Sequence, residues 1–371
     1  MVEMRSQSDL TRQSFLKESA YFRISSPLFS ALARACADDD DIVDLCSATR
    51  RGQSCGALLP SVVQYLLLKS PDPNLARYFP SLTDSPLPRE EAFPVFREFC
   101  LDRRSEVMDL LSWRTANANL VEKASCLLPA IQYISSKAEG PLTLLEICCS
   151  AGLNLLFDKY HYDYGPAGRV GAEDSPVHLN CKIIGTGRPP IDSIPIISQR
   201  VGVDLVTMDV SDPLDRLWMQ AVLCPEWTQE RSRLKAALAL RAEHDLRIIA
   251  GDALEVLPSL LEELPGSLCI LQSYCMGHWS AAARLELDNL LRSASRHRDI
   301  HRLGVEMPEN DSPQAARTRL THLAEAGIPI WQKSSPSIIE YTLYSKTKAD
   351  ARLLGEGSVF GVWVDWRVQE A

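Results

Sequence analysis

The chain has 371 residues, more than one hydrophobic core usually serves, so the sequence predicts two domains or one large domain with a substantial appendage. Hydrophobic residues make up 46% and charged residues 23%, and these ordinary values exclude an extensively disordered chain. The net charge of −9 disfavours nucleic-acid binding, because no basic patch in the sequence is strong enough to overcome the overall field.

The N-terminal residues and the lengths of the apolar runs argue against export and against a membrane protein. The first ten residues lack the apolar core of a signal peptide, and no apolar run approaches about 18 residues. The expected location is therefore cytoplasmic, with no membrane partner. The 11 cysteines are scattered and form no C-x-x-C pair, so neither a disulfide framework nor a metal site is expected.

The first part of the chain has a helical pattern, because apolar residues recur at spacings of three and four from Ser26 to about Lys137. One predicted helix starts at Pro27, and three further helices are predicted over residues 60–69, 93–114 and 120–136. Pro129 lacks a backbone donor, so a kink or break is expected there. The sequence thus predicts a helical domain over residues 1–139, whose apolar helix faces suggest a lid or a substrate wall.

After residue 140, short apolar runs alternate with helical segments, which is typical of a mostly parallel sheet with crossover helices. The predicted strands cover residues 142–147, 199–204, 246–250, 268–272, 301–306, 338–344 and 359–364. The last two leave no room for a full crossover helix, so they are expected to pair as an antiparallel hairpin at the sheet edge. The expected fold class is α/β, with this domain over residues 140–371.

A run of small side chains follows the first predicted strand and precedes a helical segment rich in Leu and Phe. Small residues at this first turn let the backbone approach a nucleoside closely. The candidate cofactor-binding residues of this turn are Glu146, Cys148, Ser150, Gly152 and Asn154. A dinucleotide G-x-G-x-x-G motif and a phosphate-binding P-loop are both missing. An ordinary strand-to-helix turn, with the cysteines as small buried fillers, remains the alternative.

Small or acidic residues also end the next predicted strands. Asp204 follows a short apolar segment, where a carboxylate can accept the two ribose hydroxyls. Asp252 and Ala253 follow the next strand, where the aspartate can cap a helix and face an adenine amino group. Ser273 opens the loop after the following strand. Each position alone also suits an ordinary turn or cap, but together they favour an adenosine-type ligand.

The chain resembles a known family, the bacterial domain-of-unknown-function family twenty-three thirty-two. The matching segments are residues 25–28, 76–82, 96–100, 127–130 and, most specifically, 145–165. The resemblance spans almost the whole chain and implies a class-I, Rossmann-like methyltransferase fold. This family has no assigned substrate, so no catalytic residue is carried over, and it usually has glycine where this chain has Cys148.

The fold that the resemblance implies indicates S-adenosylmethionine as cofactor and methyl transfer to a small molecule. Such a transfer depends mainly on alignment, because the leaving group is already activated, and a general base is optional. Candidate bases near the strand ends are His278, Tyr274 and Glu306, although a structural role also suits each of them. A non-catalytic or regulatory binding protein with the same fold is the alternative function. The sequence does not indicate an oligomeric state.

Overall fold

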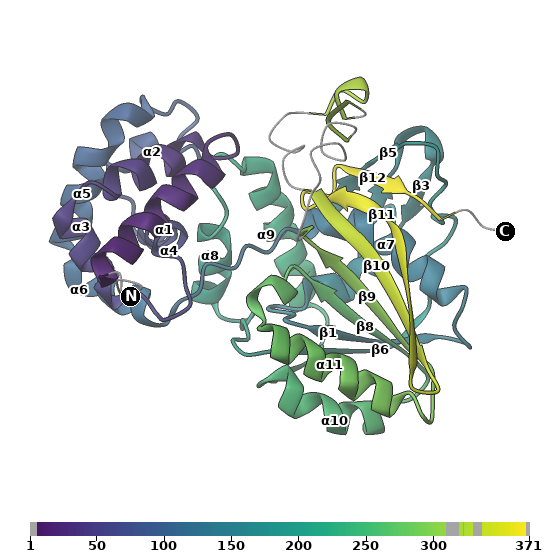
Figure 1. The fold of residues 1–371 in the computed structure, drawn as a ribbon. Helices are drawn as coiled ribbons and strands as arrows, with labels where there is room; N and C mark the ends of the chain where they lie inside the picture. The colour runs from purple at the N-terminus through teal and green to yellow at the C-terminus, as the bar shows by residue number, and fades with distance from the viewer. Residues whose placement is uncertain (1–5, 309–318, 322, 329–335, 369–371) are drawn as a thin grey trace. The chain divides into compact units, whose positions relative to one another are not determined.

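A computed structural model describes residues 6–308, 319–321, 323–328 and 336–368 (Figure 1). The chain divides into two compact units. The first unit comprises Met1–Asn119 with Ser211–Lys235, and the second comprises Leu120–Val210 with Ala236–Ala371. The expected helical domain over residues 1–139 and the first unit share residues 1–119, whereas residues 120–139 belong to the second unit.

The described part of the first unit is helical (Figure 1). Its α-helices are α1 (Gln7–Phe22), α2 (Pro27–Cys36), α3 (Asp40–Leu45), α4 (Cys55–Lys69), α5 (Ala92–Asp102), α6 (Arg104–Trp113) and α8 (Pro213–Ala221). Helix α9 (Thr228–Ala242) begins in this unit and ends in the second. Its short 3-10 turns are η1 (Cys46–Ala48), η2 (Ala76–Tyr78) and η3 (Arg89–Glu91).

The helix boundaries differ from the predicted ones where packing outweighs local signals. The sequence pattern did not predict α1, which starts with a capping box between Ser6 and Asp9. Helix α4 begins at Cys55, before Pro60, because nearly all of it is buried. The helix predicted over residues 93–114 is divided between α5 and α6 at Arg103.

Buried polar contacts join residues 211–235 to the rest of the first unit. Gln64 Nε2 donates to the carbonyl oxygens of Ala221 and Leu223, both at 2.7 Å. The buried Arg114 guanidinium pairs with Asp215 at 2.7 Å. Because Gln64 and Arg114 are buried, residues 211–235 help to complete the core of the first unit.

The second unit is built on a nine-stranded sheet with the order β5-β12-β11-β10-β9-β8-β1-β6-β7. The strands are β1 (Leu142–Ile147), β5 (Lys182–Ile184), β6 (Ile197–Asp204), β7 (Arg247–Ala250), β8 (Ser267–Ser273), β9 (Ile300–Glu306), β10 (Pro336–Ser345), β11 (Lys348–Ser358) and β12 (Trp363–Trp366). Neighbours in the run β7-β6-β1-β8-β9 pair in parallel, and β10, β11 and β12 continue antiparallel. The mostly parallel α/β architecture is thus confirmed.

Helices α7 (Ala124–Ser135), α10 (Ala253–Glu263) and α11 (Ala281–Ala294) and a second small sheet also belong to the described part of this unit. Helices α10 and α11 contribute to an apolar core with β1, β6 and β8. Helix α7, which follows η4 (Val121–Lys123), contacts β9 to β12. Pro129 does not break α7, which is buried along most of its length, so the expected break was wrong.

The segment after β1 is more irregular than the sequence predicts. The expected helix is the short 3-10 segment η5 (Leu153–Lys159), whose Leu156 has non-helical dihedral angles. A three-stranded sheet with the order β3-β2-β4 follows it. Its strands are β2 (His161–Asp163), β3 (Arg169–Gly171) and β4 (His178–Asn180), with η6 (Gly165–Ala167) between β2 and β3.

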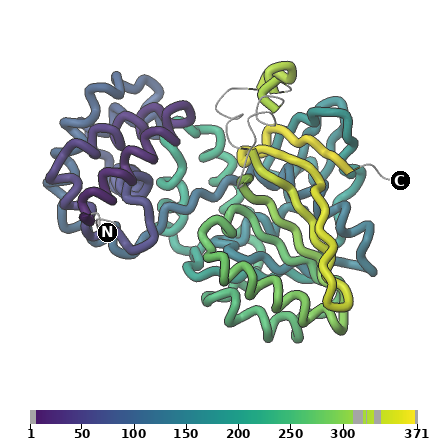
Figure 2. Tube along the Cα trace, in the orientation of Figure 1, coloured from purple at the N-terminus to yellow at the C-terminus, as the bar shows by residue number. Residues whose placement is uncertain are grey.

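The predicted strand over residues 359–364 was wrong, because most of it is the turn between β11 and β12. The hairpin forms instead between β10 and β11, and Figure 2 shows the chain turning back on itself there. Lys346 and Thr347 make this turn with positive φ angles of 50° and 67°. The first half of β11 is mainly exposed and its second half contains Gly355 and Gly357, so β11 lacks a clear apolar alternation.

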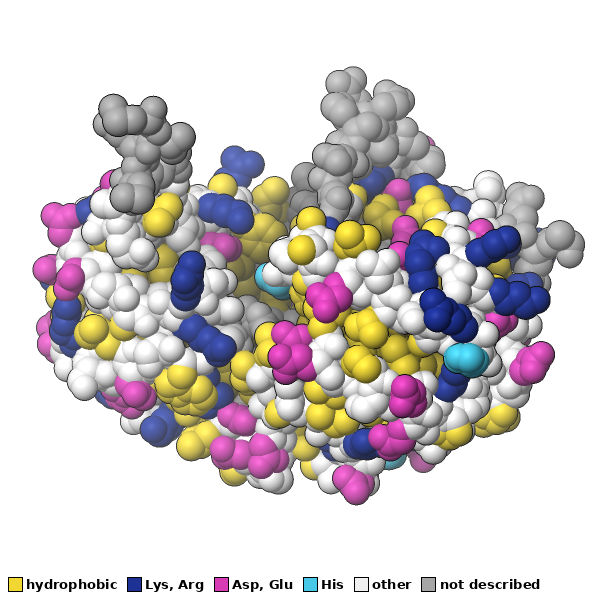
Figure 3. Space-filling model, turned by 60° about the horizontal axis from the view of Figure 1, so that its bottom comes forward, with side chains coloured by type: hydrophobic (Ala, Val, Ile, Leu, Met, Phe, Trp, Pro, Cys, Tyr) yellow, Lys and Arg dark blue, Asp and Glu magenta, His cyan; other side chains and the backbone are white. Residues whose placement is uncertain are grey.

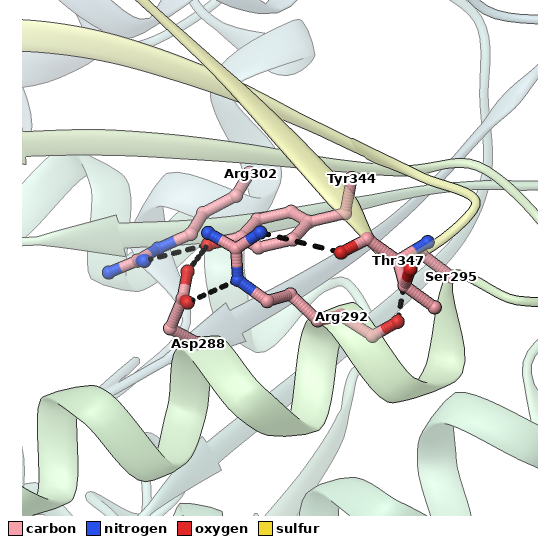
Figure 4. A network of polar contacts seen from close by, with 6 residues as sticks. All are labelled: Asp288, Arg292, Ser295, Arg302, Tyr344 and Thr347. Carbon is pink, nitrogen blue, oxygen red and sulfur yellow. Dashed lines mark hydrogen bonds and ion pairs between the residues drawn. The ribbon is translucent and has the colours of Figure 1, made fainter.

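A polar network fastens the end of α11 to the sheet (Figure 4). The Tyr344 hydroxyl donates to Asp288 Oδ1 at 2.8 Å and accepts from Arg302 Nη1 at 3.2 Å. Asp288 Oδ2 also accepts from Arg292 Nε at 2.6 Å. Three elements, α11, β9 and β10, are therefore held together by one carboxylate and one phenol.

Acidic side chains are scattered among basic and apolar ones on the face drawn in Figure 3, which accords with the net charge of −9. In the described part of the chain, no helix combines the length and the apolar character needed to cross a membrane.

Candidate functional site

The carboxyl ends of the parallel strands define the candidate site. Numbered in chain order, the parallel strands β7, β6, β1, β8 and β9 have the order 3-2-1-4-5. The direction of winding therefore reverses between β1 and β8. In open α/β sheets, ligands bind beyond the carboxyl ends of the strands at such a reversal point. All the candidate site residues predicted from the sequence follow or end one of these strands, or begin the next element.

The turn after β1 alternates between left-handed and other backbone conformations. Cys148, Ser150 and Gly152 have φ angles of 59°, 52° and 74°. Glycine adopts this region without strain, whereas a side chain at such a position costs of order 1 kcal/mol or more. Two strained residues thus occupy the segment that the small-residue pattern marked as a ligand loop. Strain of this kind concentrates at functional sites.

Strand β6 holds this turn through three alternate residues on one face. Arg200 donates from Nε to the carbonyl oxygen of Leu155 at 2.9 Å and pairs with Asp158 at 2.6 Å. A Cβ atom at Gly202 would lie 2.5 Å from Cys149 Sγ, so glycine lets the turn approach the strand. Asp204 completes the row at the end of β6.

The Asp204 carboxylate links the turn to the start of the next loop. Its Oδ2 accepts the backbone N–H of Ser150 at 2.7 Å, and its Oδ1 accepts that of Val206 at 3.0 Å. A carboxylate oxygen has two lone pairs, so each oxygen retains capacity to accept a hydroxyl. Leu205, which follows, is 70% exposed and offers an apolar surface beside this carboxylate.

Glu146 lies buried beneath the turn. Its Oε1 accepts from Asn154 Nδ2 at 2.5 Å, so these two predicted residues are brought together. Its Oε2 is buried and has no hydrogen-bond partner. Burial raises the pKa of Glu146 to about 7, against the opposing effects of the Lys123 ammonium and the Asn154 hydrogen bond.

The residues after β7 and β8 differ in exposure. Asp252 is exposed and caps α10 by accepting the backbone N–H of Leu254 at 2.8 Å, and Ala253 is the buried first residue of that helix. Ser273 is buried, and its hydroxyl oxygen has no hydrogen-bond partner. The structure thus shows the capping role of Asp252, whose side chain is exposed.

The candidate bases lie at the ends of β8 and β9. Tyr274 has a φ angle of 57°, and its hydroxyl contacts Ser337 Oγ. Glu306 is half-buried, and its Oε1 accepts the backbone N–H groups of Cys275 and Met276, each at 3.2 Å. Burial raises the pKa of Glu306, and these two hydrogen bonds oppose the shift. His278 is exposed at the end of η7 (Met276–His278).

Sequence reasoning missed Lys123, which comes from η4 and lies near Tyr274, Glu146 and Glu306. The Lys123 ammonium is 5.7 Å from the centroid of the Tyr274 ring. Burial lowers the pKa of Lys123, and the carboxylates of Glu146 and Glu306 oppose that shift. A single lysine in a helical segment forms no sequence motif, so its place beside the candidate site is apparent only from the fold.

Residues 12–366 match the family described as an uncharacterized protein conserved in bacteria, DUF2332. The chain belongs to this family. No curated protein is similar enough in sequence to match the chain. The block over residues 145–165 lies within the matched range and contains both the turn that Asp204 binds and the η5 segment that Arg200 binds.

Proposed function

We propose that this DUF2332 protein is an S-adenosylmethionine-dependent methyltransferase that acts on a small molecule, with a Rossmann-like second unit. The observation that carries the proposal is the turn after β1, in which residues 148, 150 and 152 are left-handed and Asp204 binds Ser150. The parallel order 3-2-1-4-5 supports it, because doubly wound nucleotide-binding sheets share this order.

The residues present fit an adenosyl sulfonium. Asp204 has lone pairs left for the ribose hydroxyls, and the exposed Leu205 offers an apolar surface for a base. Asp252, at the end of β7, is assigned to the adenine amino group. The buried atoms Glu146 Oε2 and Ser273 Oγ lack partners at this edge. We assign the cofactor to Glu146, Cys148, Ser150, Gly152, Asn154, Asp204, Asp252, Ala253 and Ser273.

The protein contributes to the reaction mainly by positioning the reactants and by placing charged side chains near them. S-adenosylmethionine supplies a methyl group already activated by its sulfonium. The carboxylate of Asp204 creates a negative potential that favours a cation at the turn. Tyr274 and Glu306 are assigned to orient the acceptor and receive its proton, because each is held by neighbours at the strand ends. His278 is an exposed third candidate for that proton.

The alternative function is a binding or regulatory protein that keeps this fold without methyl transfer. The side chain of Cys148 favours this alternative, because it occupies a left-handed position that glycine adopts without strain. A thiol here narrows the approach to the turn and strains its backbone.

Calorimetric titration of the full chain separates the two functions. S-adenosylmethionine and S-adenosylhomocysteine should both bind with a one-to-one stoichiometry, and the Asp204→Asn variant should lose most of that affinity. Binding of neither ligand to the wild-type protein would rule out the methyltransferase proposal.

A further inference from the structure

The backbone of Glu122 and Lys123 packs closely against Gly361, in the turn between β11 and β12. A Cβ atom at Gly361 would lie only 1.7 Å from the carbonyl oxygen of Glu122 and 3.1 Å from the backbone nitrogen of Lys123. On the other side, the Tyr164 hydroxyl donates to the carbonyl oxygen of Ser125 at 2.8 Å. The backbone of η4 and that of the start of α7 are thus each held by contacts with distant residues.

The ammonium of Lys123 has carboxylates nearby but no ion pair with them. Among the described residues, Lys123 takes part in no ion pair and donates no hydrogen bond. Glu146 Oε1 accepts from Asn154 and its Oε2 has no hydrogen-bond partner, while Glu306 Oε1 accepts two backbone N–H groups, so none of these contacts involves Lys123. The ammonium instead lies over the Tyr274 ring. A half-buried ammonium in this situation gains from an anionic partner supplied by a ligand.

The position of Lys123 relates it to the acceptor rather than to the nucleoside. The residues assigned to ribose and adenine, Asp204 and Asp252, follow β6 and β7 on one side of β1. Lys123 lies over the ring of Tyr274, which follows β8 on the other side of β1, and its charge interacts with the carboxylates of Glu146 and Glu306.

We propose that the methyl acceptor carries a carboxylate, and that Lys123 binds this carboxylate beside Tyr274 and determines acceptor specificity. This inference rests on the proposed function. A carboxylate suits the site better than a phosphate, because a dianion would be repelled more strongly by Glu146 and Glu306. The assignment makes Lys123 a binding residue that selects acidic acceptors over neutral isosteres.

Matched acid and amide probes test the proposal on the full chain. Ligand-observed NMR would measure the Kd of benzoate, benzamide and phenyl phosphate, and of acetate and acetamide, with and without S-adenosylhomocysteine. The wild-type protein should bind at least one acid about tenfold or more tighter than its amide, since a hydrogen bond to a charged group is worth about 1.5–3 kcal/mol. Phenyl phosphate should bind more weakly than benzoate.

Variants test whether the preference for an acid over its amide depends on Lys123. Lys123→Met should reduce the ratio of amide to acid Kd to about one, and Lys123→Arg should retain part of it. Lys137→Met is the matched control, because Lys137 is an exposed cation 5.4 Å from the Tyr133 ring centroid, and it should keep the wild-type ratio. A preference that survives Lys123→Met, or wild-type protein that binds neither acid, overturns the inference.

The two proposals fail in different ways. If S-adenosylhomocysteine does not bind but the acid preference depends on Lys123, the methyltransferase proposal fails and the carboxylate site stands. If S-adenosylhomocysteine binds and no acid preference exists, only the assignment of Lys123 fails.

Discussion

The backbone N–H of Ser150 donates to Asp204 Oδ2 at 2.7 Å, so one carboxylate joins the turn after β1 to the end of β6. Asp204→Asn replaces one accepting oxygen with a donor, which cannot accept the N–H of Ser150 or Val206. We expect the free energy of unfolding to fall by about 1–3 kcal/mol and the affinity for S-adenosylmethionine to fall at least about tenfold. Urea unfolding and calorimetry measure the two effects.

Asp212→Asn is the control for that variant. Asp212 also accepts a backbone N–H two residues ahead, that of Leu214 at 2.8 Å, but it caps α8 in the first unit. Its variant should lose some stability and keep the affinity of the wild-type protein. Equal affinities for all three proteins would contradict the role given to Asp204.

Cys148→Gly should strengthen cofactor binding. Glycine removes the side chain from the turn and the strain at a φ of 59°, while it adds backbone entropy to the unfolded chain. We therefore expect stability to change by less than about 1 kcal/mol and the affinity for S-adenosylmethionine to rise. Lys346→Gly, at a φ of 50° in the β10–β11 turn, should leave affinity unchanged. Weaker binding after Cys148→Gly would show that the thiol supports the ligand.

Stability should fall as the pH rises from about 4.5 to about 7, because of Glu146. Its pKa is raised to about 7 by burial, so over this range the unfolded chain loses the Glu146 proton first. The folded state then holds more protons, and the favourable contribution present at acidic pH is lost, by up to roughly 3 kcal/mol. The raised pKa of Glu306 acts in the same direction.

Urea unfolding at about pH 5 and about pH 8 measures this dependence for wild type and Glu146→Gln. The glutamine variant should lose most of the Glu146 contribution. Glu263→Gln is the control, because the pKa of that exposed carboxylate is lowered by Arg247. An identical pH dependence in wild type and Glu146→Gln would contradict the assignment.

Gly361→Ala should destabilise the second unit. Its Cβ atom would lie 1.7 Å from the carbonyl oxygen of Glu122, and the φ angle of 58° disfavours alanine. We expect a loss of at least about 2 kcal/mol in the free energy of unfolding, measured with urea. Gly277→Ala meets open space and should cost less than about 1 kcal/mol. Similar losses of unfolding free energy in both variants would mean that the η4 backbone moves to make room for the added Cβ atom.

The expected lid or wall role of the helical domain is tested by hydrogen exchange. Amides in residues 26–137 should exchange more slowly after addition of S-adenosylmethionine if these helices order around the ligand. Unchanged exchange throughout that range, together with slower exchange at residues 148–154, would leave the helices without a part in binding.

Sequence reasoning recovered the features that are local or periodic. The turn at residues 148–152, Asp204 and most strands of the sheet follow from apolar runs that end in small or acidic residues. It failed where tertiary packing decides the structure. Strand β11 has charged residues and two glycines, and its pairing with β10 comes from the hairpin turn. Lys123 reaches the site only because Gly361 lets two distant backbone segments meet.

The row formed by Arg200, Gly202 and Asp204 also constrains the order of folding. The turn after β1 and the η5 segment that follows it have contacts with β6 some fifty positions later in the chain, and the strained angles lie beside the contact of Ser150 with Asp204. Closing so long a loop is entropically costly, so the turn gains its native shape only after β6 has joined β1 in register. A nascent chain released before β6 is synthesised would therefore carry the complete sequence of the turn and still be unable to form it.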